Sequence, residues 1–193
     1  TFVKTGGHFV KLILSVIVGL ATLIAPFNAK AVPGKLFNRV IFVVFENTNY
    51  KDAIKQPFFA QLASQGANLT NFIAETHPSQ ANYIAMTAGT LGGVKGDGRY
   101  DLNLTNVVDL LEAHGISWKV YAEGWPGNCY LGMNKGQYYR KHNPMISFKN
   151  IQSNSARCAK IVDEKAFDRD LASGQLPQYV LYVPDAKDDG HDT

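Results

Sequence analysis

The chain has 193 residues, of which 46% are hydrophobic and 18% charged, so it holds enough apolar material for one folded domain with a buried core. Three of its 19 basic residues, Lys4, Lys11 and Lys30, lie before residue 32, and the remaining 16 balance the 16 acidic residues. The formal net charge of +3 therefore belongs to the N-terminal segment. Residues 32–193 have no net charge, so they show no excess of basic residues that would attract nucleic acid or a membrane surface. We therefore expect no nucleic-acid partner.

The N-terminal segment has the pattern of a targeting signal. Lys4 and Lys11 precede an apolar run over residues 12–27, and Ala29-Lys30-Ala31 then places small side chains at the two positions that a signal peptidase recognises. A transmembrane anchor is the alternative, but the run is short for a membrane span. We predict a signal peptide over residues 1–31 and one domain over residues 32–193. The mature protein is then secreted or periplasmic and has no stable membrane anchor.

Strand and helix patterns alternate along residues 32–193. Apolar runs typical of strands occupy residues 39–45, 67–74, 116–122 and 179–183, and helical patterns occupy residues 57–66, 79–88, 105–114 and 161–172. This alternation predicts an α/β three-layer sandwich with a mainly parallel sheet. No helix follows the last strand to cover it, so we expect the domain to be truncated at its C-terminus.

The same patterns predict local detail. The continuous β-branched run of the first strand is typical of burial on both faces of a parallel sheet. We expect Ser79 to be the N-cap of helix 79–88, with Ile84 and Met86 facing inward, and Thr105 to cap the next helix. Residues 123–157 form a long connection rich in Gly, Asn and Tyr, which is typical of a functional loop.

The two cysteines lie in or next to this connection. Cys129 falls within it, and Cys158 follows it directly. In an oxidising compartment an even pair of cysteines indicates a disulfide, while two free thiols are the alternative. Export therefore predicts a Cys129–Cys158 bond.

Polar clusters follow the ends of two predicted strands. Glu46 and Asn47 come directly after the first strand, and an acidic segment with Asp185, Asp189 and His191 follows the last. Ligands of open α/β sheets bind beyond the carboxyl ends of the strands, so we expect these side chains to meet at one edge. Carboxylate, amide and imidazole groups there can ligate a divalent metal ion, although turn capping and a solvated acidic loop are the alternatives.

A serine hydroxyl and two groups of basic residues add to these candidate metal ligands. Ser79 stands at a strand-to-helix junction, where free N–H groups bind phosphate, although a plain helix cap is the alternative. Asn82 lies one turn further on, and His77 is a candidate metal ligand or proton donor. The loop Lys141-His142-Asn143 can supply phosphate-binding groups and a general acid, or it is only an exposed basic loop. Together these clusters predict metal-assisted phosphoryl transfer.

Four ordered motifs carry a family resemblance. They are Glu46-Asn47-Thr48-Asn49-Tyr50, Thr76-His77-Pro78-Ser79-Gln80-Ala81-Asn82-Tyr83, Lys141-His142-Asn143-Pro144 and Asp189-Gly190-His191-Asp192. They resemble the bacterial and fungal phosphoesterase family, which includes secreted acid phosphatases and phosphocholine-type phospholipases C. That family belongs to the alkaline-phosphatase-like superfamily, so the resemblance implies the fold of that superfamily.

The resemblance also implies roles for individual residues. Ser79 matches the nucleophile that forms a phosphoseryl intermediate, and Asn82 matches a phosphate-binding residue. His142, with Lys141, matches a motif near the phosphate or the leaving group. The implied metal ligands are Glu46, Asn47, Asp189 and His191, with Asp185 as an alternative ligand. Two features depart from the family: Ala81 stands where Pro is usual, and the downstream acidic motif that completes the metal site is absent.

These observations lead to one hypothesis and two alternatives. The hypothesis is a secreted, metal-dependent hydrolase of phosphoric esters that acts on a small phosphorylated substrate. The first alternative is a phospholipase C-type phosphodiesterase that binds a phospholipid headgroup through an aromatic pocket. Its candidate residues are Tyr121, Trp125, Tyr130, Tyr138 and Tyr139. The second alternative is a non-catalytic secreted binding domain of the same fold.

Overall fold

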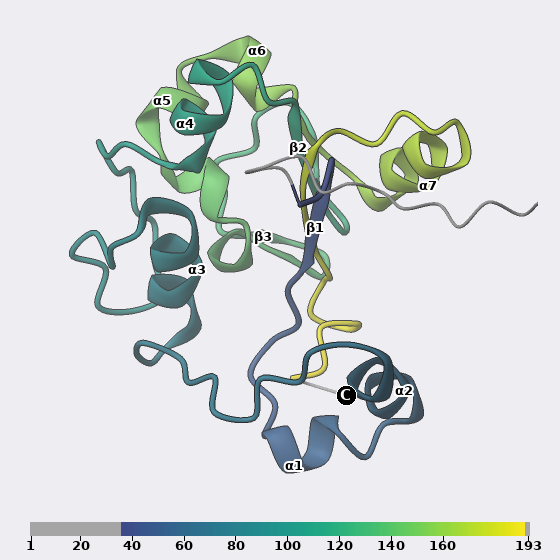
Figure 1. Ribbon diagram of the computed structural model, residues 1–193. Helices are drawn as coiled ribbons and strands as arrows, with labels where there is room; N and C mark the ends of the chain where they lie inside the picture. Colours follow the sequence, from purple (N-terminus) through teal and green to yellow (C-terminus); the bar gives the residue numbers. More distant parts are fainter. Residues whose placement is uncertain (1–35, 192–193) are drawn as a thin grey trace, which may run out of the picture. The chain divides into compact units, whose positions relative to one another are not determined.

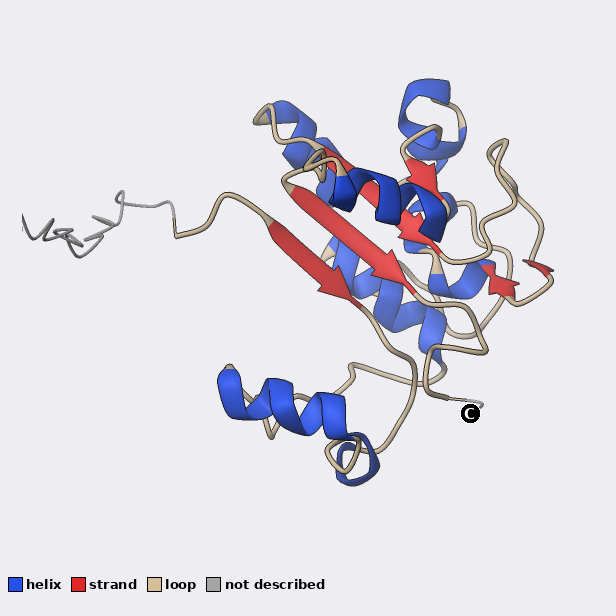
Figure 2. Cartoon of the chain, turned by 90° about the vertical axis from the view of Figure 1, so that its right-hand side faces the viewer, coloured by secondary structure: helices blue, strands red, loops and turns tan. Residues whose placement is uncertain are grey.

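Four parallel strands form the central sheet in the described part of the chain, residues 36–191 of a computed structural model. In spatial order they are β1 (Val40–Val43), β6 (Tyr179–Val183), β2 (Trp118–Ala122) and β5 (Ile161–Val162). The β1, β6 and β2 strands run side by side, with Val40 and Trp118 both paired to Tyr179 (Figure 2). The predicted signal peptide over residues 1–31 lies outside the described residues.

Both faces of the sheet carry helices, as Figure 1 shows. Side chains at alternate positions, such as Val120 and Leu181, pack on one side, and Tyr121 and Val180 pack on the other. The first side holds α3 (Ser79–Ala88), α4 (Val107–Ala113), α5 (Lys149–Gln152), α6 (Ser155–Cys158) and the 3-10 helix η2 (Pro144–Ser147). The second side holds α7 (Glu164–Ala172). The predicted α/β architecture with a parallel sheet flanked by helices is confirmed.

The first strand differs from its prediction. Within the described residues β1 pairs only with β6, and Ile41, Phe42 and Val43 are 42–48% exposed. The expectation that β1 is buried on both faces is therefore wrong for this part of the chain. An apolar run specifies a strand, but its position in the sheet depends on which other strands pair with it.

The predicted strand over residues 67–74 is also wrong, because the described chain has turns and loop there. Leu69, Phe72 and Ile73 are 68–84% exposed. Before this segment lie α1 (Tyr50–Ala53) and α2 (Pro57–Gln65), and the predicted helix at 57–66 is confirmed. A β-branched segment becomes a strand only where a neighbouring strand accepts its backbone hydrogen bonds.

Helix starts differ from the predictions by one to three residues. Pro78 is the N-cap of α3, so Ser79 is the first helical residue and not the cap. Asn106, rather than Thr105, caps α4, where it forms a reciprocal capping box with Asp109. Predicted helix 161–172 begins only after β5, at Glu164. Cap choice depends on which side chain reaches a free N–H group, and patterns locate helix ends only to within a few residues.

The α3 helix buries one of its two predicted inward residues. Ile84 is fully buried, whereas Met86 is 41% exposed. Residues that are two positions apart along a helix point about 200° away from each other around its axis, so Ile84 and Met86 cannot share one narrow face. Figure 1 shows α3 on the same side of the sheet as α4 and α5.

The long connection after β2 is folded rather than open. It contains the hairpin β3 (Asn134–Lys135) and β4 (Tyr138–Tyr139), followed by the 3-10 helix η1 (Arg140–His142). The fully buried Arg140 guanidinium donates to the carbonyls of Leu131 at 2.8 Å and Tyr100 at 2.7 Å and pairs with Asp101 at 2.8 Å. Cys129 and Cys158 form the predicted disulfide. These contacts give the loop that carries Lys141 and His142 a fixed course.

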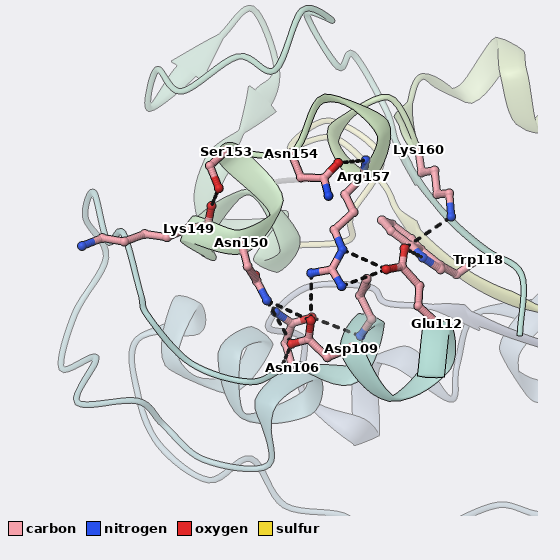
Figure 3. A network of polar contacts seen from close by, with 11 residues as sticks. Asn106, Asp109, Glu112, Trp118, Lys149, Asn150, Ser153, Asn154, Arg157 and Lys160 are labelled. Atoms are coloured by element: carbon pink, nitrogen blue, oxygen red, sulfur yellow. Dashed lines mark hydrogen bonds and ion pairs between the residues drawn. The ribbon is translucent and has the colours of Figure 1, made fainter. Parts of the chain in front are cut away.

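A polar network joins α4 to α6, and Figure 3 shows Arg157 at its centre. The Arg157 guanidinium lies 2.8 Å from Asp109 Oδ1 and 2.8 Å from Glu112 Oε2. Glu112 also accepts a hydrogen bond of 3.0 Å from the Trp118 indole of β2. The network therefore ties the helical layer to the sheet beneath it.

No helix within residues 36–191 is long and apolar enough to cross a membrane.

Candidate active site

The chain segments that leave β1 and β6 stay together beyond the sheet. The Glu46 amide donates to the Asp189 carbonyl at 2.8 Å, and the Thr48 hydroxyl donates to the Gly190 carbonyl. Parallel neighbours end at the same sheet edge, so the polar residues that follow both strands are brought together there. The structure thus places Glu46 beside Asp189.

A polar cavity of about 360 Å³ opens at this edge. It gathers eight of the residues expected from the sequence, namely Glu46, Asn47, His77, Ser79, Lys141, His142, Asp189 and His191. Asp97 and Tyr139 line the same cavity. Ser79 comes from α3, Tyr139 from β4, and Lys141 and His142 from η1. The other residues come from loops, including those that follow β1 and β6.

A second cavity of about 620 Å³ adjoins the first and shares Glu46, Asn47, His77 and Ser79 with it. Its other walls are mainly apolar, and they include Val44, Phe45, Phe72, Ile73, Ala85 and Met86. Asn82 also lines it. Ser79 therefore stands where a polar cavity meets an apolar one.

His142 lies between two carboxylates. Its Nε2 atom is 3.4 Å from Glu46 Oε1, and its Nδ1 atom is 3.7 Å from Asp189 Oδ2. All three side chains are at most 6% exposed, and the imidazole stacks on Tyr83 with ring centroids 5.3 Å apart. Packing and charge together fix the orientation of this imidazole.

Glu46 carries a negative charge at neutral pH. Burial raises the pKa of Glu46, but the nearby His142 imidazole, the Ser79 hydroxyl and the Asn47 amide outweigh it and bring the pKa to about 2. Burial, together with the charges of Glu46 and Asp189, raises the pKa of Tyr83, so its phenol stays protonated. The site thus combines buried anions with a neutral hydroxyl group, and the Ser79 side chain lies next to one of these anions.

Residues 37–193 match the Phosphoesterase family. The chain belongs to this family. It is 39% identical over 171 residues to a probable acid phosphatase of Kluyveromyces lactis. These residues are 84% of this chain and 41% of that protein. It is 37% identical over 190 residues to an acid phosphatase of Aspergillus fumigatus, covering 93% of this chain and 42% of that protein.

A bacterial relative is also similar. A phosphatidylinositol-3-phosphatase of Mycobacterium tuberculosis is 32% identical over 170 residues, which is 85% of this chain and 54% of that protein. The chain thus spans about half, or less, of the length of each of these relatives.

The residues of this site include donors of the kind that a divalent cation takes. Glu46 and Asp189 offer buried carboxylates, Asn47 a carboxamide oxygen and His191 an imidazole, all in the polar cavity. Carboxylates held away from water are costly unless positive charge compensates them. Oxygen and imidazole donors are the ligands that borderline and hard divalent ions take.

Asp185 lies in a different place from the other predicted ligands. It does not line the polar cavity, and its carboxylate lies within 4.8 Å of those of Glu123 and Asp188. The Asp185 carboxylate also accepts hydrogen bonds from the amides of Lys187 at 2.9 Å and Asp188 at 3.2 Å. The alternative ligand is thus in a separate acidic group at the end of β2 and β6.

Two predicted substrate contacts have other partners in the structure. Asn143 is fully buried and donates to the Tyr138 hydroxyl at 3.3 Å, so it lines neither cavity of the site. The Asn82 carboxamide accepts from the Thr76 amide at 3.1 Å and donates to the Thr76 carbonyl at 2.7 Å. Asn82 therefore holds the turn before Ser79, and its second N–H remains for the cavity that it lines.

Sequence patterns did not identify Asp97 or Tyr83 as parts of this site. Asp97 lies between Gly96 and Gly98, a composition that predicts only a turn. Tyr83 has the spacing of a core residue on an amphipathic helix. The resemblance motif contained Tyr83, but nothing in it indicated the stack on His142.

Proposed function

We propose that this chain provides the nucleophile and part of the metal site of an exported, metal-dependent phosphoric ester hydrolase of the acid phosphatase type. We also propose the fold of the alkaline-phosphatase-like superfamily for the whole protein, and residues 1–31 as its signal peptide. The observation that carries the activity is the position of Ser79. It opens α3, contacts Glu46 and faces a cavity that also holds Lys141 and His142.

The start of α3 suits a phosphoryl group. The first N–H groups of this ten-residue helix have no carbonyl partner within the helix, and its dipole favours negative charge at this end. The Lys141 ammonium of η1 adds positive charge to the same cavity. Together they favour a phosphate whose phosphorus lies next to Ser79 Oγ.

The chemistry assigned to the protein groups is a double displacement. Ser79 Oγ releases its proton to solvent and bonds to phosphorus while the bond to the leaving oxygen breaks. His142, or the more exposed His77, gives a proton to the leaving alcohol. Water then cleaves the phosphoseryl ester and restores the hydroxyl group. A divalent metal ion held by Glu46, Asn47, Asp189 and His191 would favour ionisation of a hydroxyl group and offset the phosphate charge.

The test is hydrolysis of an aryl phosphate by the full-length protein that contains this chain, with and without chelator. We expect Ser79→Ala to lower kcat by at least about a thousandfold without changing the unfolding midpoint. Ser64→Ala, an exposed serine of α2 that lines neither cavity, is the matched control. Full turnover in Ser79→Ala would exclude this nucleophile, and full turnover after chelation would exclude the metal.

A second candidate is a phosphate ester that carries an apolar or lipid group. The apolar walls of the 620 Å³ cavity next to Ser79 favour it. Of the aromatic residues expected to bind phosphocholine, Tyr121, Trp125 and Tyr138 are at most 8% exposed and pack in the core, whereas Tyr139 lines the polar cavity. Comparison of an aryl phosphate with a phosphocholine ester separates monoester from diester hydrolysis. A protein that binds no divalent metal and cleaves neither ester would be a non-catalytic domain.

A further inference from the structure

The loop after α3 returns to the start of the same helix. Gly89 ends α3 in the left-handed conformation with φ of 67°, and Gly92 adopts φ of 62°. The positive φ favours glycine at position 92, and a Cβ atom there would lie 2.8 Å from a methyl carbon of Leu104, which would have to move. This reversal brings Asp97 back to the helix end that carries Ser79.

Asp97 and Gln80 then form a reciprocal pair. Asp97 Oδ1 accepts from the Gln80 amide at 3.1 Å, and Gln80 Oε1 accepts from the Gly98 amide at 2.7 Å. Within residues 36–191 the N-cap residue Pro78 makes no side-chain cap hydrogen bond to α3. Asp97 therefore supplies, from a distant loop, the acceptor that a cap residue usually supplies locally.

The second oxygen of the same carboxylate binds the lysine of the site. Lys141 Nζ donates to Asp97 Oδ2 at 3.1 Å, and it also lies 5.8 Å from the centroid of the Tyr139 ring. The Lys141 and Asp97 side chains are 29% and 31% exposed, and both line the polar cavity. One carboxylate thus connects the two walls of the cavity, the start of α3 and η1.

The energetics favour a role in positioning over a role in stability. Ion pairs that are this exposed contribute little to the free energy of folding. A free lysine side chain samples many rotamers, and fixing it before substrate arrives removes part of the entropy cost of binding. A carboxylate in a phosphate cavity repels the substrate unless a cation neutralises it, and here Lys141 lies against it.

We propose that Asp97 is a positioning residue of this site. It holds the Lys141 ammonium at the phosphate cavity and fixes the first turn of the helix that carries Ser79. This inference rests on the proposed phosphoesterase function, and it adds a residue that no motif of the sequence indicated.

The test uses Asp97→Asn in the full-length protein. Asparagine keeps an oxygen for the Gln80 amide but loses the charge that holds Lys141. We expect KM for an aryl phosphate and the inhibition constant of inorganic phosphate to rise about fivefold to tenfold, with kcat changed by less than about twofold. We expect the unfolding midpoint to stay the same.

Two further variants show whether the effect passes through Lys141. Lys141→Met should raise the same two constants. The double variant Asp97→Asn with Lys141→Met should raise them by a factor smaller than the product of the two single fold-changes. Asp52→Asn is the matched control, because Asp52 pairs with Lys55 at 3.0 Å on an exposed helix, and it should leave both constants at wild-type values.

The outcomes separate the two proposals. Wild-type KM and phosphate inhibition in Asp97→Asn, or independent effects of Asp97 and Lys141, would overturn the positioning role while the hydrolase remains. A lower unfolding midpoint with unchanged KM would assign Asp97 a purely structural role. A wild-type protein that neither hydrolyses phosphate esters nor binds inorganic phosphate would instead overturn the proposed function, and this inference with it.

Discussion

Replacement of Asn82 by alanine is expected to loosen the turn that precedes the nucleophile. In the structure the Asn82 carboxamide makes two hydrogen bonds with the backbone of Thr76, an accepted bond of 3.1 Å and a donated bond of 2.7 Å. Both are partly buried, and both tie the segment that carries His77 to the first turn of α3. Alanine removes both hydrogen bonds, so the Thr76 amide and carbonyl lose their side-chain partner.

The size of the effect follows from those two bonds. A net contribution of about 1 kcal/mol for each hydrogen bond predicts a loss of about 2 kcal/mol in the free energy of unfolding. Chemical denaturation of the full-length protein measures it. Asn68→Ala is the matched control, because Asn68 is exposed and makes one side-chain bond of 2.9 Å to Tyr50. The control should change stability by less than about 0.5 kcal/mol.

Two results bear on this reasoning. A stability loss below about 0.5 kcal/mol in Asn82→Ala would refute it, because the bonds to Thr76 would then contribute nothing measurable. Phosphate inhibition of the same variant addresses the other predicted role of Asn82. If inhibition is unchanged while stability falls, Asn82 shapes the turn and does not bind phosphate.

Other parts of the fold give further predictions. Ile84→Ala, at a fully buried position of α3, should lower the free energy of unfolding by about 3 kcal/mol in a denaturant titration, and a loss below about 1 kcal/mol would contradict the packing. Arg157→Met should cost about 2 kcal/mol at pH 7, measured in the same way. Burial raises the pKa of Asp109 and Glu112, but their hydrogen bonds and the Arg157 charge outweigh it and lower both. The Arg157 contribution should thus be complete above the unfolded pKa of about 4 and disappear as the pH falls through the lower folded pKa values. A difference between wild type and Arg157→Met that is independent of pH would contradict this assignment.

Local patterns were sufficient for most of the secondary structure. The β6 strand occupies Tyr179–Val183 as predicted, and the helix predicted at 57–66 matches α2, which ends at Gln65. These elements are specified by short apolar runs and by Pro and Gly at their ends, which act within a few residues. The run at 67–74 failed because a strand needs a neighbour for its backbone, and no local pattern shows whether one is present.

The positions of the site residues were likewise predictable from the sequence only in part. The sequence by itself determined that Glu46, Asn47, Ser79 and Asp189 follow strands or open a helix, and parallel topology then places such positions at one edge of a sheet. It also determined the cysteine pair. These properties depend on the order of residue types along the chain and on general rules of α/β folds.

Only the tertiary structure decided which neighbours reach the cavity. Asp185 and Asp189 are four residues apart, yet Asp189 faces His142 while Asp185 joins Glu123. Asp97 reaches Lys141 across 44 residues because glycines turn the chain back along α3. Side-chain direction and loop course are set by packing between segments distant in sequence, so periodicity and spacing carry no information about them.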